Sequence, residues 1–172
     1  MKKLINFIQF QAIWFLCILG GAHGYEWQAI LLSSLILVWA WFVSEGRQHD
    51  QRLVMIAIAI GIVADTSLIW LGVMSFKSEF WTGFSPIWMP FIWAALAMTI
   101  QSSMSWLAGR LKLAAVLGAI SGPFAYWAGI RMEAGVFNDF SVAIVALSFI
   151  WLLVTPFLFY CSQRLKESHV RY

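Results

Sequence analysis

The sequence predicts an all-α integral membrane protein, a bundle of six transmembrane helices in a single domain that covers residues 1–172. Composition is the first reason: 62% of the residues are hydrophobic and only 11% are charged, with a mean hydropathy of +0.80. A soluble domain is nearer to half apolar and a quarter charged. Pattern is the second reason, because the apolar residues form long runs separated by short polar breaks, which is typical of transmembrane helices.

Six apolar runs are each long enough to cross a hydrocarbon core of roughly 30 Å, since a helix rises about 1.5 Å per residue. The third run contains the carboxylate of Asp65, and the fifth and sixth contain Pro123 and Pro156, which kink helices. The predicted spans are residues 4–20, 27–43, 53–74, 87–108, 113–130 and 140–161.

The first span has two interpretations. Residues 1–24 resemble a secretory signal, with two lysines ahead of an apolar core and small residues after it. However, Asn6, Gln9 and Gln11 interrupt the apolar core, and residues 20–24 lack the usual small-x-small ending of a cleavage site. We therefore expect an uncleaved span.

The cations predict the orientation of the bundle. Of the 11 Lys and Arg residues, Lys77 and Arg131 lie on one side of the predicted membrane and the other nine on the opposite side. Cationic loops stay in the cytoplasm, so both chain termini are expected to be cytoplasmic. An even number of spans requires the same arrangement. The nine are Lys2, Lys3, Arg47, Arg52, Arg110, Lys112, Arg164, Lys166 and Arg171.

Small residues predict how the spans pack, because close helix approach in lipid depends on them. The third span has Gly61 in a stripe of small residues whose face also carries Asp65. The fourth has an alanine stripe with Gln101 on the same face, and the fifth has Gly118 and Gly122 in a Gly-xxx-Gly pattern. We expect spans three, four and five to form the bundle centre, with these glycines serving packing.

Asp65 is the acidic residue that lies deep within a predicted span. It sits roughly 20 Å from the inner flank, near the membrane midplane, where an ionised carboxylate costs about 3 kcal/mol on insertion scales. It either stays protonated and hydrogen-bonds within the bundle, or it faces a wet cavity or a cationic partner. A structural interhelical hydrogen bond and a functional polar site both fit this placement.

Other polar and aromatic residues share the depth of Asp65. Gln101 is its first expected neighbour, because it lies at similar depth on a matching small-residue face. Trp14, Trp93 and Trp151 lie deeper than the interfacial tryptophans and are expected to pack in the bundle or to line a cavity. The expected polar binding pocket consists of Asp65, Gln101, Ser102, Trp93 and Tyr126.

Histidine positions weigh against intramembrane catalysis. His23, His49 and His169 all fall in predicted loops or the tail. An intramembrane metal site or Ser–His protease needs histidines within the spans, so we expect no catalytic residue, metal or cofactor. The segment 44–52, which contains His49, is expected to be a solvated cytoplasmic loop. The net charge of +3 comes from membrane-flanking cations, and no nucleic-acid partner is expected.

Five short motifs, taken in their order and spacing, resemble a family of bacterial inner-membrane proteins catalogued as domain of unknown function 2878. They are "NFIQFQAIWF" (6–15), "GIVAD" (61–65), "PIWMPFIW" (86–93), "SWL" (105–107) and "GAISGPFAYWAG" (118–129). The resemblance covers nearly the whole chain and implies a multi-pass protein of the bacterial inner membrane. The family often has an Asn-His pair before the serine of the fourth span, whereas this chain has Gln101 before Ser102.

The resemblance brings no established activity. Members of the family are often encoded near enzymes that modify membrane fatty acids, which implies a link to lipid metabolism or envelope stress. Three functions therefore compete. The first is binding or moving a lipid or small apolar molecule in a central polar pocket around Asp65. The second is a membrane subunit of a fatty-acid- or lipid-modifying system, and the third is a non-catalytic membrane scaffold. Membrane lipids, lipid-modifying enzymes and a second copy of the chain are the expected partners.

Overall fold

The computed structural model describes residues 1–44, 46–78 and 81–170, and in these the regular secondary structure is helical apart from two three-residue strands. The helices expected at 4–20, 27–43 and 113–130 are present with bounds that differ by a few residues. The elements in chain order are α1 (Lys2–His23), α2 (Glu26–Val43), α3 (Arg47–Trp70), β1 (Met74–Phe76), α4 (Met89–Ile100), the 3₁₀ helix η1 (Ser105–Leu107), α5 (Leu111–Arg131), β2 (Gly135–Phe137) and α6 (Phe140–Val170).

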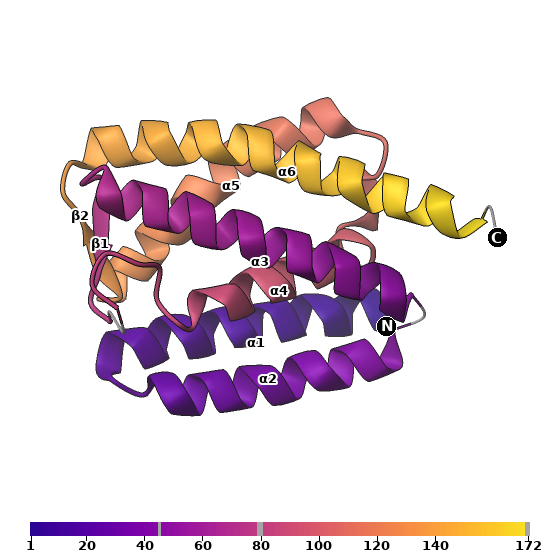
Figure 1. The fold of residues 1–172 in the computed structure, drawn as a ribbon, viewed down its shortest axis with the longest axis horizontal. Helices are drawn as coiled ribbons and strands as arrows, with labels where there is room; N and C mark the ends of the chain where they lie inside the picture. The colour runs from indigo at the N-terminus through magenta and orange to yellow at the C-terminus, as the bar shows by residue number, and fades with distance from the viewer. Residues whose placement is uncertain (45, 79–80, 171–172) are drawn as a thin grey trace.

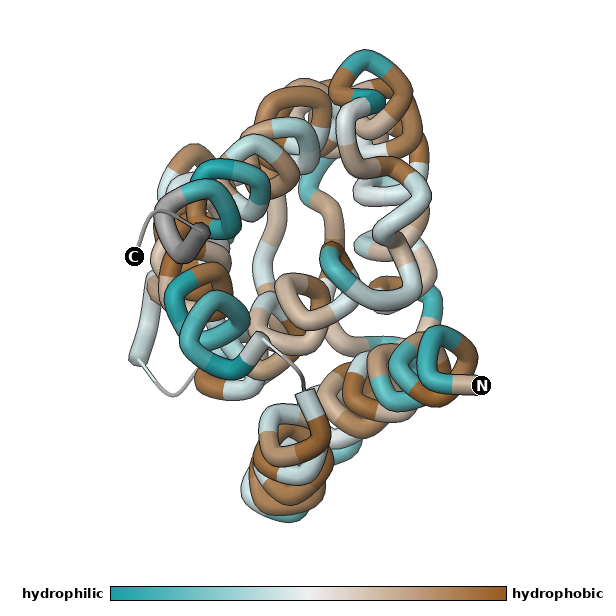
Figure 2. Tube along the Cα trace, turned by 90° about the vertical axis from the view of Figure 1, so that its right-hand side faces the viewer, coloured by the Kyte–Doolittle hydropathy of each residue, from teal (hydrophilic) through white to brown (hydrophobic). Residues whose placement is uncertain are grey.

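The helices lie side by side along the long axis of the molecule (Figure 1). The strands lie at one end, which we call the strand end, and both termini lie toward the other, the termini end. Viewed from the termini end, hydrophilic residues gather at the helix ends nearest the viewer (Figure 2). The chain therefore begins and finishes on the same side of the apolar bundle.

The centre of the bundle is α4, which packs chiefly against α3 and α1 and also contacts α2 and α6. In contrast, α5 packs mainly along α6. The expectation that spans three, four and five form the centre is therefore wrong for α5. Its small-residue stripe is real, but the stripe faces α6 rather than α3 or α4, because a Cβ at Gly118 or Gly122 would overlap atoms of α6.

The predicted fourth span is much shorter than expected. Its helix ends at Ile100 instead of continuing to residue 108, and two turns and η1 follow. The amides of Ser102 and Met104 both bond back to the carbonyl of Thr99, which closes the helix. Serine side chains compete for backbone groups, so the polar run 101–103 favours this termination. A helix of 12 residues is only about 18 Å long.

Among the described residues, five helices are long and apolar enough to cross a membrane, and α4 is a shorter apolar helix. This is the architecture of a multi-pass membrane protein, in which the fourth of the six expected spans is a short helix. Between β1 and the start of α5, the chain still runs from the strand end toward the termini end. The segment that covers this distance consists of α4, η1 and the turns between them (Figure 1).

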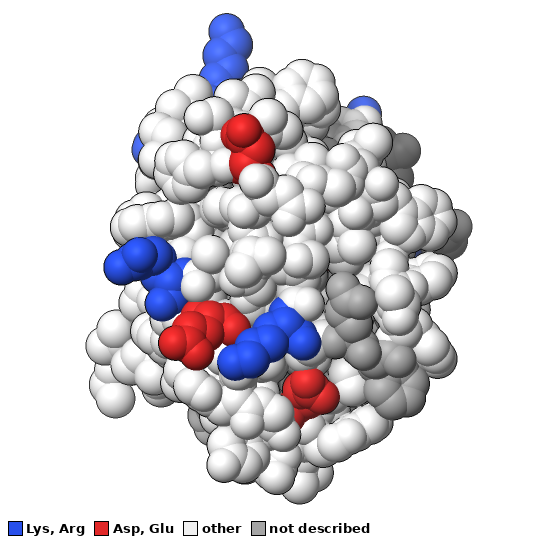
Figure 3. Space-filling model, turned by 90° about the vertical axis from the view of Figure 1, so that its left-hand side faces the viewer, with Lys and Arg blue, Asp and Glu red and all other residues white. Residues whose placement is uncertain are grey.

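The strand end is closed by an antiparallel pair in which Met74 lies opposite Phe137 and Phe76 opposite Gly135. A Cβ at Gly135 would overlap the carbonyl of Ser75, so the strands approach closely only because this residue is glycine. Figure 3 shows that this end carries few charged side chains, and that basic and acidic groups lie beside each other. Short paired strands thus satisfy backbone groups where α3 and α5 end.

Candidate functional site

Asp65 links three helices. Its side chain on α3 is completely buried. The indole Nε1 of Trp93 on α4 donates a hydrogen bond to Oδ2 at 3.0 Å, and the hydroxyl of Tyr126 on α5 donates to Oδ1. Both carboxylate oxygens therefore have partners, and each partner comes from a different helix. Asp65 consequently holds two aromatic side chains in fixed positions.

Small residues allow these aromatic rings to reach Asp65. Gly61 lies one turn before Asp65, and a Cβ there would overlap the indole of Trp93. The Trp93 ring stacks on Trp151 of α6 with centroids 5.0 Å apart and an interplanar angle of 8°. Trp151 in turn lies against Gly122, where a Cβ would overlap its ring. The position of each ring is thus set by a glycine on the neighbouring helix.

Trp93 and Tyr126 also line an apolar cavity of about 70 Å³ between α1, α4 and α5, near the strand end. We call it the aromatic cavity. Asp65 does not line it, because the two aromatic side chains stand between the carboxylate and the open space. Trp14, Trp93 and Trp151 all line the cavity. This agrees with the expectation that they pack in the bundle or line a cavity. Other wall residues include Phe10, Ile18, Ile92, Leu96, Ala125, Gly129 and Ile130.

The expected polar pocket is split in two. Asp65, Trp93 and Tyr126 come together, but Gln101 and Ser102 lie elsewhere, so Gln101 is not the neighbour of Asp65. The reason is the length and direction of α4. Gln101 follows Trp93 by eight residues, or about 12 Å along a helix, and this distance carries it toward the termini end.

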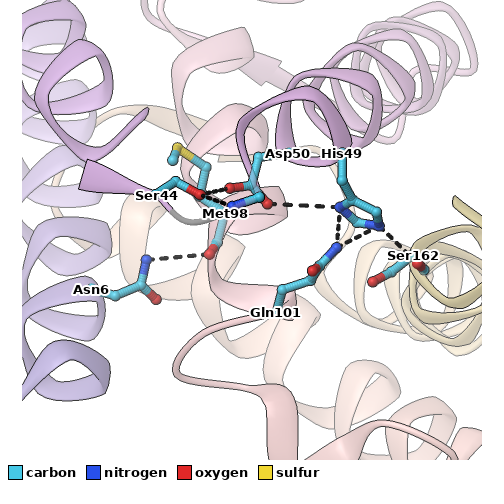
Figure 4. Close-up of polar contacts among 8 residues, drawn as sticks. Asn6, Ser44, His49, Asp50, Met98, Gln101 and Ser162 are labelled. Atoms are coloured by element: carbon cyan, nitrogen blue, oxygen red, sulfur yellow. Dashed lines mark hydrogen bonds and ion pairs between the residues drawn. The ribbon is translucent and has the colours of Figure 1, made fainter. Parts of the chain in front are cut away.

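Gln101 belongs to a polar cluster at the termini end (Figure 4). Its side-chain amide bonds to the ring of His49, and His49 Nε2 donates to the backbone carbonyl of Ser162 on α6 at 2.8 Å. Asp50 accepts a hydrogen bond from the hydroxyl of Ser44, and its Oδ1 lies 3.8 Å from His49 Nδ1. The cluster therefore joins the ends of α2 and α4, and α6 at Ser162, to the start of α3.

Asn6 forms the second part of this polar region, on α1. Its side-chain Nδ2 donates to the carbonyl of Met98 at 3.2 Å, and its Oδ1 accepts from the hydroxyl of Ser103 at 2.8 Å. These contacts hold the last turn of α4 against α1. They also engage Ser103, which lies in the turn directly after α4.

The placement of His49 corrects the sequence interpretation. The segment 44–52 is not simply a solvated loop, because α3 begins at Arg47 and both His49 and Asp50 are buried. One signal could have revealed this. Buried positions on α3 recur every four residues, so extending the stripe of Gly61 and Asp65 toward the N-terminus leads to the histidine. The stripe is His49, Leu53, Ala57, Gly61 and Asp65.

One of the comparisons with known proteins gives a match. A model of the family described as protein of unknown function, DUF2878, matches residues 3–157. The chain belongs to this family. No curated protein and no solved structure matches it. The resemblance read from the five motifs is thus confirmed, and because the family's description carries no activity, function has to be argued from the residues.

Proposed function

We propose that this member of the family binds a small apolar molecule or the end of a lipid chain inside the bundle, in the aromatic cavity of about 70 Å³ beside Asp65. One observation carries the proposal: an almost wholly apolar cavity lies within helices that are themselves apolar enough for a membrane. Ligand sites are typically concave and apolar, with a few fixed polar groups. The wall of this one is built from aromatic rings whose positions are fixed.

In this proposal Asp65 is a positioning residue. Its oxygens hold the Trp93 indole and the Tyr126 phenol, and those two rings face the ligand. Preformed walls favour binding because little side-chain freedom is lost when the ligand arrives. The polar pocket expected around Asp65 thus becomes an apolar cavity with a carboxylate behind its wall.

Filling the cavity is the direct test. Ala125 lines the cavity from α5, so Ala125→Phe places a ring where the ligand would lie. We expect the variant to lose photo-crosslinking to a diazirine-labelled palmitic acid several-fold in purified protein. The control is Ala59→Phe, the same change at an exposed position of α3. Crosslinking that is equal in Ala125→Phe and wild type, with both proteins monodisperse, would rule out this cavity.

We further propose that the protein lies in the bacterial inner membrane with both termini in the cytoplasm. The cation bias supports this orientation, because the termini end carries Lys and Arg residues from the chain ends and two connections, whereas the strand end has Lys77 and Arg131. An alkaline phosphatase fused after Tyr172 is expected to be inactive, and a green fluorescent protein fused there is expected to fluoresce. An active phosphatase would reverse the orientation.

A further inference from the structure

The aromatic cavity is elongated along the axis of the bundle. Its lining residues on α1 run from Phe10 to Ile18, and those on α4 run from Met89 to Leu96. Each of these intervals corresponds to about 10–12 Å along a helix. Ile18 and Met89 lie toward the strand end, because α1 runs toward that end and α4 runs away from it (Figure 1). The cavity therefore extends from the middle of the bundle toward the strand end.

At the strand end the cavity is closed by four buried residues, Met74, Phe76, Met89 and Ala134, which we call the cavity floor. Phe76 lines both the cavity and a hollow of about 450 Å³ on the outer surface of the strand pair, so its side chain lies between the two. The Phe76 ring packs edge-on against the buried ring of Trp88, with centroids 5.7 Å apart. A chain that enters the cavity from the middle of the bundle would therefore end at the floor.

Toward the middle of the bundle the wall of the cavity is less covered. Ile92 and Leu96 lie one turn apart on α4, and both are only half-buried although α4 is the central helix. This face of α4 has little cover because α5 packs mainly along α6. Phe10 on α1 and Ala125 on α5 flank the face and are also half-buried. We call these four residues the cavity mouth, and it faces sideways between α1 and α5.

The wall suits hydrocarbon and not a headgroup. Among the residues that the structure describes, no charged side chain lines the cavity, and the polar groups of Trp93 and Tyr126 are bonded to Asp65. A phosphate or carboxylate inside it would lose its hydration without a cation to compensate, which is costly. The volume of about 70 Å³ has room for about five to seven water-sized groups, so only the end of a chain fits.

We propose that the ligand is the methyl end of a phospholipid acyl chain, which enters through the cavity mouth and ends on the cavity floor. This inference rests on the proposed function and adds the source and the direction of the chain. A phospholipid with its headgroup at the termini end directs its chains toward the strand end, which is the direction in which the cavity runs. A chain from the opposite leaflet would have to turn back on itself. The site therefore takes lipids of the leaflet at the termini end, and the headgroup stays outside the bundle.

Two photo-crosslinking probes test the direction of the chain, with the full-length protein in lipid nanodiscs. Both are phosphatidylglycerols, one with a diazirine at the methyl end of an acyl chain and one with a diazirine at mid-chain, and peptide mass spectrometry locates the labelled residues. We expect the methyl-end probe to label the cavity floor several-fold more than the mid-chain probe, which should label the cavity mouth. Equal labelling of the floor by both probes, or the reverse order, would overturn the direction of entry. If neither probe labels the floor, the proposal is wrong.

A third probe separates two sources of the chain. Free palmitic acid with a diazirine at its methyl end offers the same chain end as the phospholipid. We expect the phosphatidylglycerol probe to label the cavity floor at least as strongly at equal concentration. Floor labelling by the free acid alone would overturn the phospholipid assignment.

Ala125→Phe places a ring in the cavity mouth and is expected to abolish floor labelling, whereas Ala59→Phe, at an exposed position of α3, should leave it unchanged. This pair of variants keeps the two proposals distinguishable. If Ala125→Phe blocks crosslinking but the order of labelling along the chain is wrong, the proposed function stands and only the tail-first entry fails. Floor labelling that persists in Ala125→Phe would overturn both.

Discussion

Asp65→Leu is expected to abolish stable accumulation of the protein, whereas Asp65→Asn will accumulate like wild type. Leucine removes both acceptors, and the Trp93 indole N–H and the Tyr126 hydroxyl are left buried without partners. Each unsatisfied group costs about 1–3 kcal/mol, so the loss is about 2–6 kcal/mol. Asparagine keeps both contacts, because its oxygen accepts from the indole and its amide donates to the phenol oxygen.

Fluorescence-detected size-exclusion chromatography of detergent extracts measures this difference, together with palmitic-acid crosslinking of the purified proteins. If Asp65 acts only by positioning the two rings, Asp65→Asn retains both the folded peak and the crosslink. A folded Asp65→Asn protein that no longer crosslinks would show that the charge itself is required for the ligand. A stable Asp65→Leu protein would show that the three-helix link is dispensable.

Gly122→Leu is expected to separate α5 from α6. A Cβ at residue 122 would already overlap the Trp151 ring, and at residue 118 it would overlap Thr155, so a leucine at either position forces the helices apart. Overpacking typically costs about 1–3 kcal/mol, and more where the backbone must shift. We expect Gly118→Leu and Gly122→Leu both to lower the melting temperature in detergent strongly.

Ser121→Leu is the matched control for these variants, because residue 121 adjoins Gly122 on α5 but is exposed at the outer surface of the bundle. Its melting temperature should equal that of wild type. Because Trp151 stacks on Trp93, a Gly122→Leu protein that still folds should also lose crosslinking in the aromatic cavity. Wild-type melting and crosslinking in Gly122→Leu would mean that α5 and α6 do not pack as described.

The long helices could be predicted because hydropathy and length are properties of a single segment. The early end of α4 could not, since averaging over residues 87–108 conceals the polar run at Gln101 among apolar neighbours. Strands as short as β1 and β2 leave almost no periodic signal. The depth of Asp65 in its span predicts that the carboxylate needs a partner. Depth alone does not identify the helix, or the face of that helix, that supplies the partner. For the same reason the sequence predicts the wrong neighbour for Gln101, and it predicts a solvated loop for His49, which is buried.

The strand pair between β1 and β2 has a consequence for the order of assembly. It fastens residue 76 to residue 135 and so closes a chain loop that contains α4. At about 18 Å, α4 is too short to span a bilayer of roughly 30 Å by itself. It therefore depends on neighbouring helices, chiefly α3 and α1, which leave the ribosome before it. The central helix of the bundle is thus inserted beside partners that are already made, and the loop that contains it closes only when β2 has followed and paired with β1.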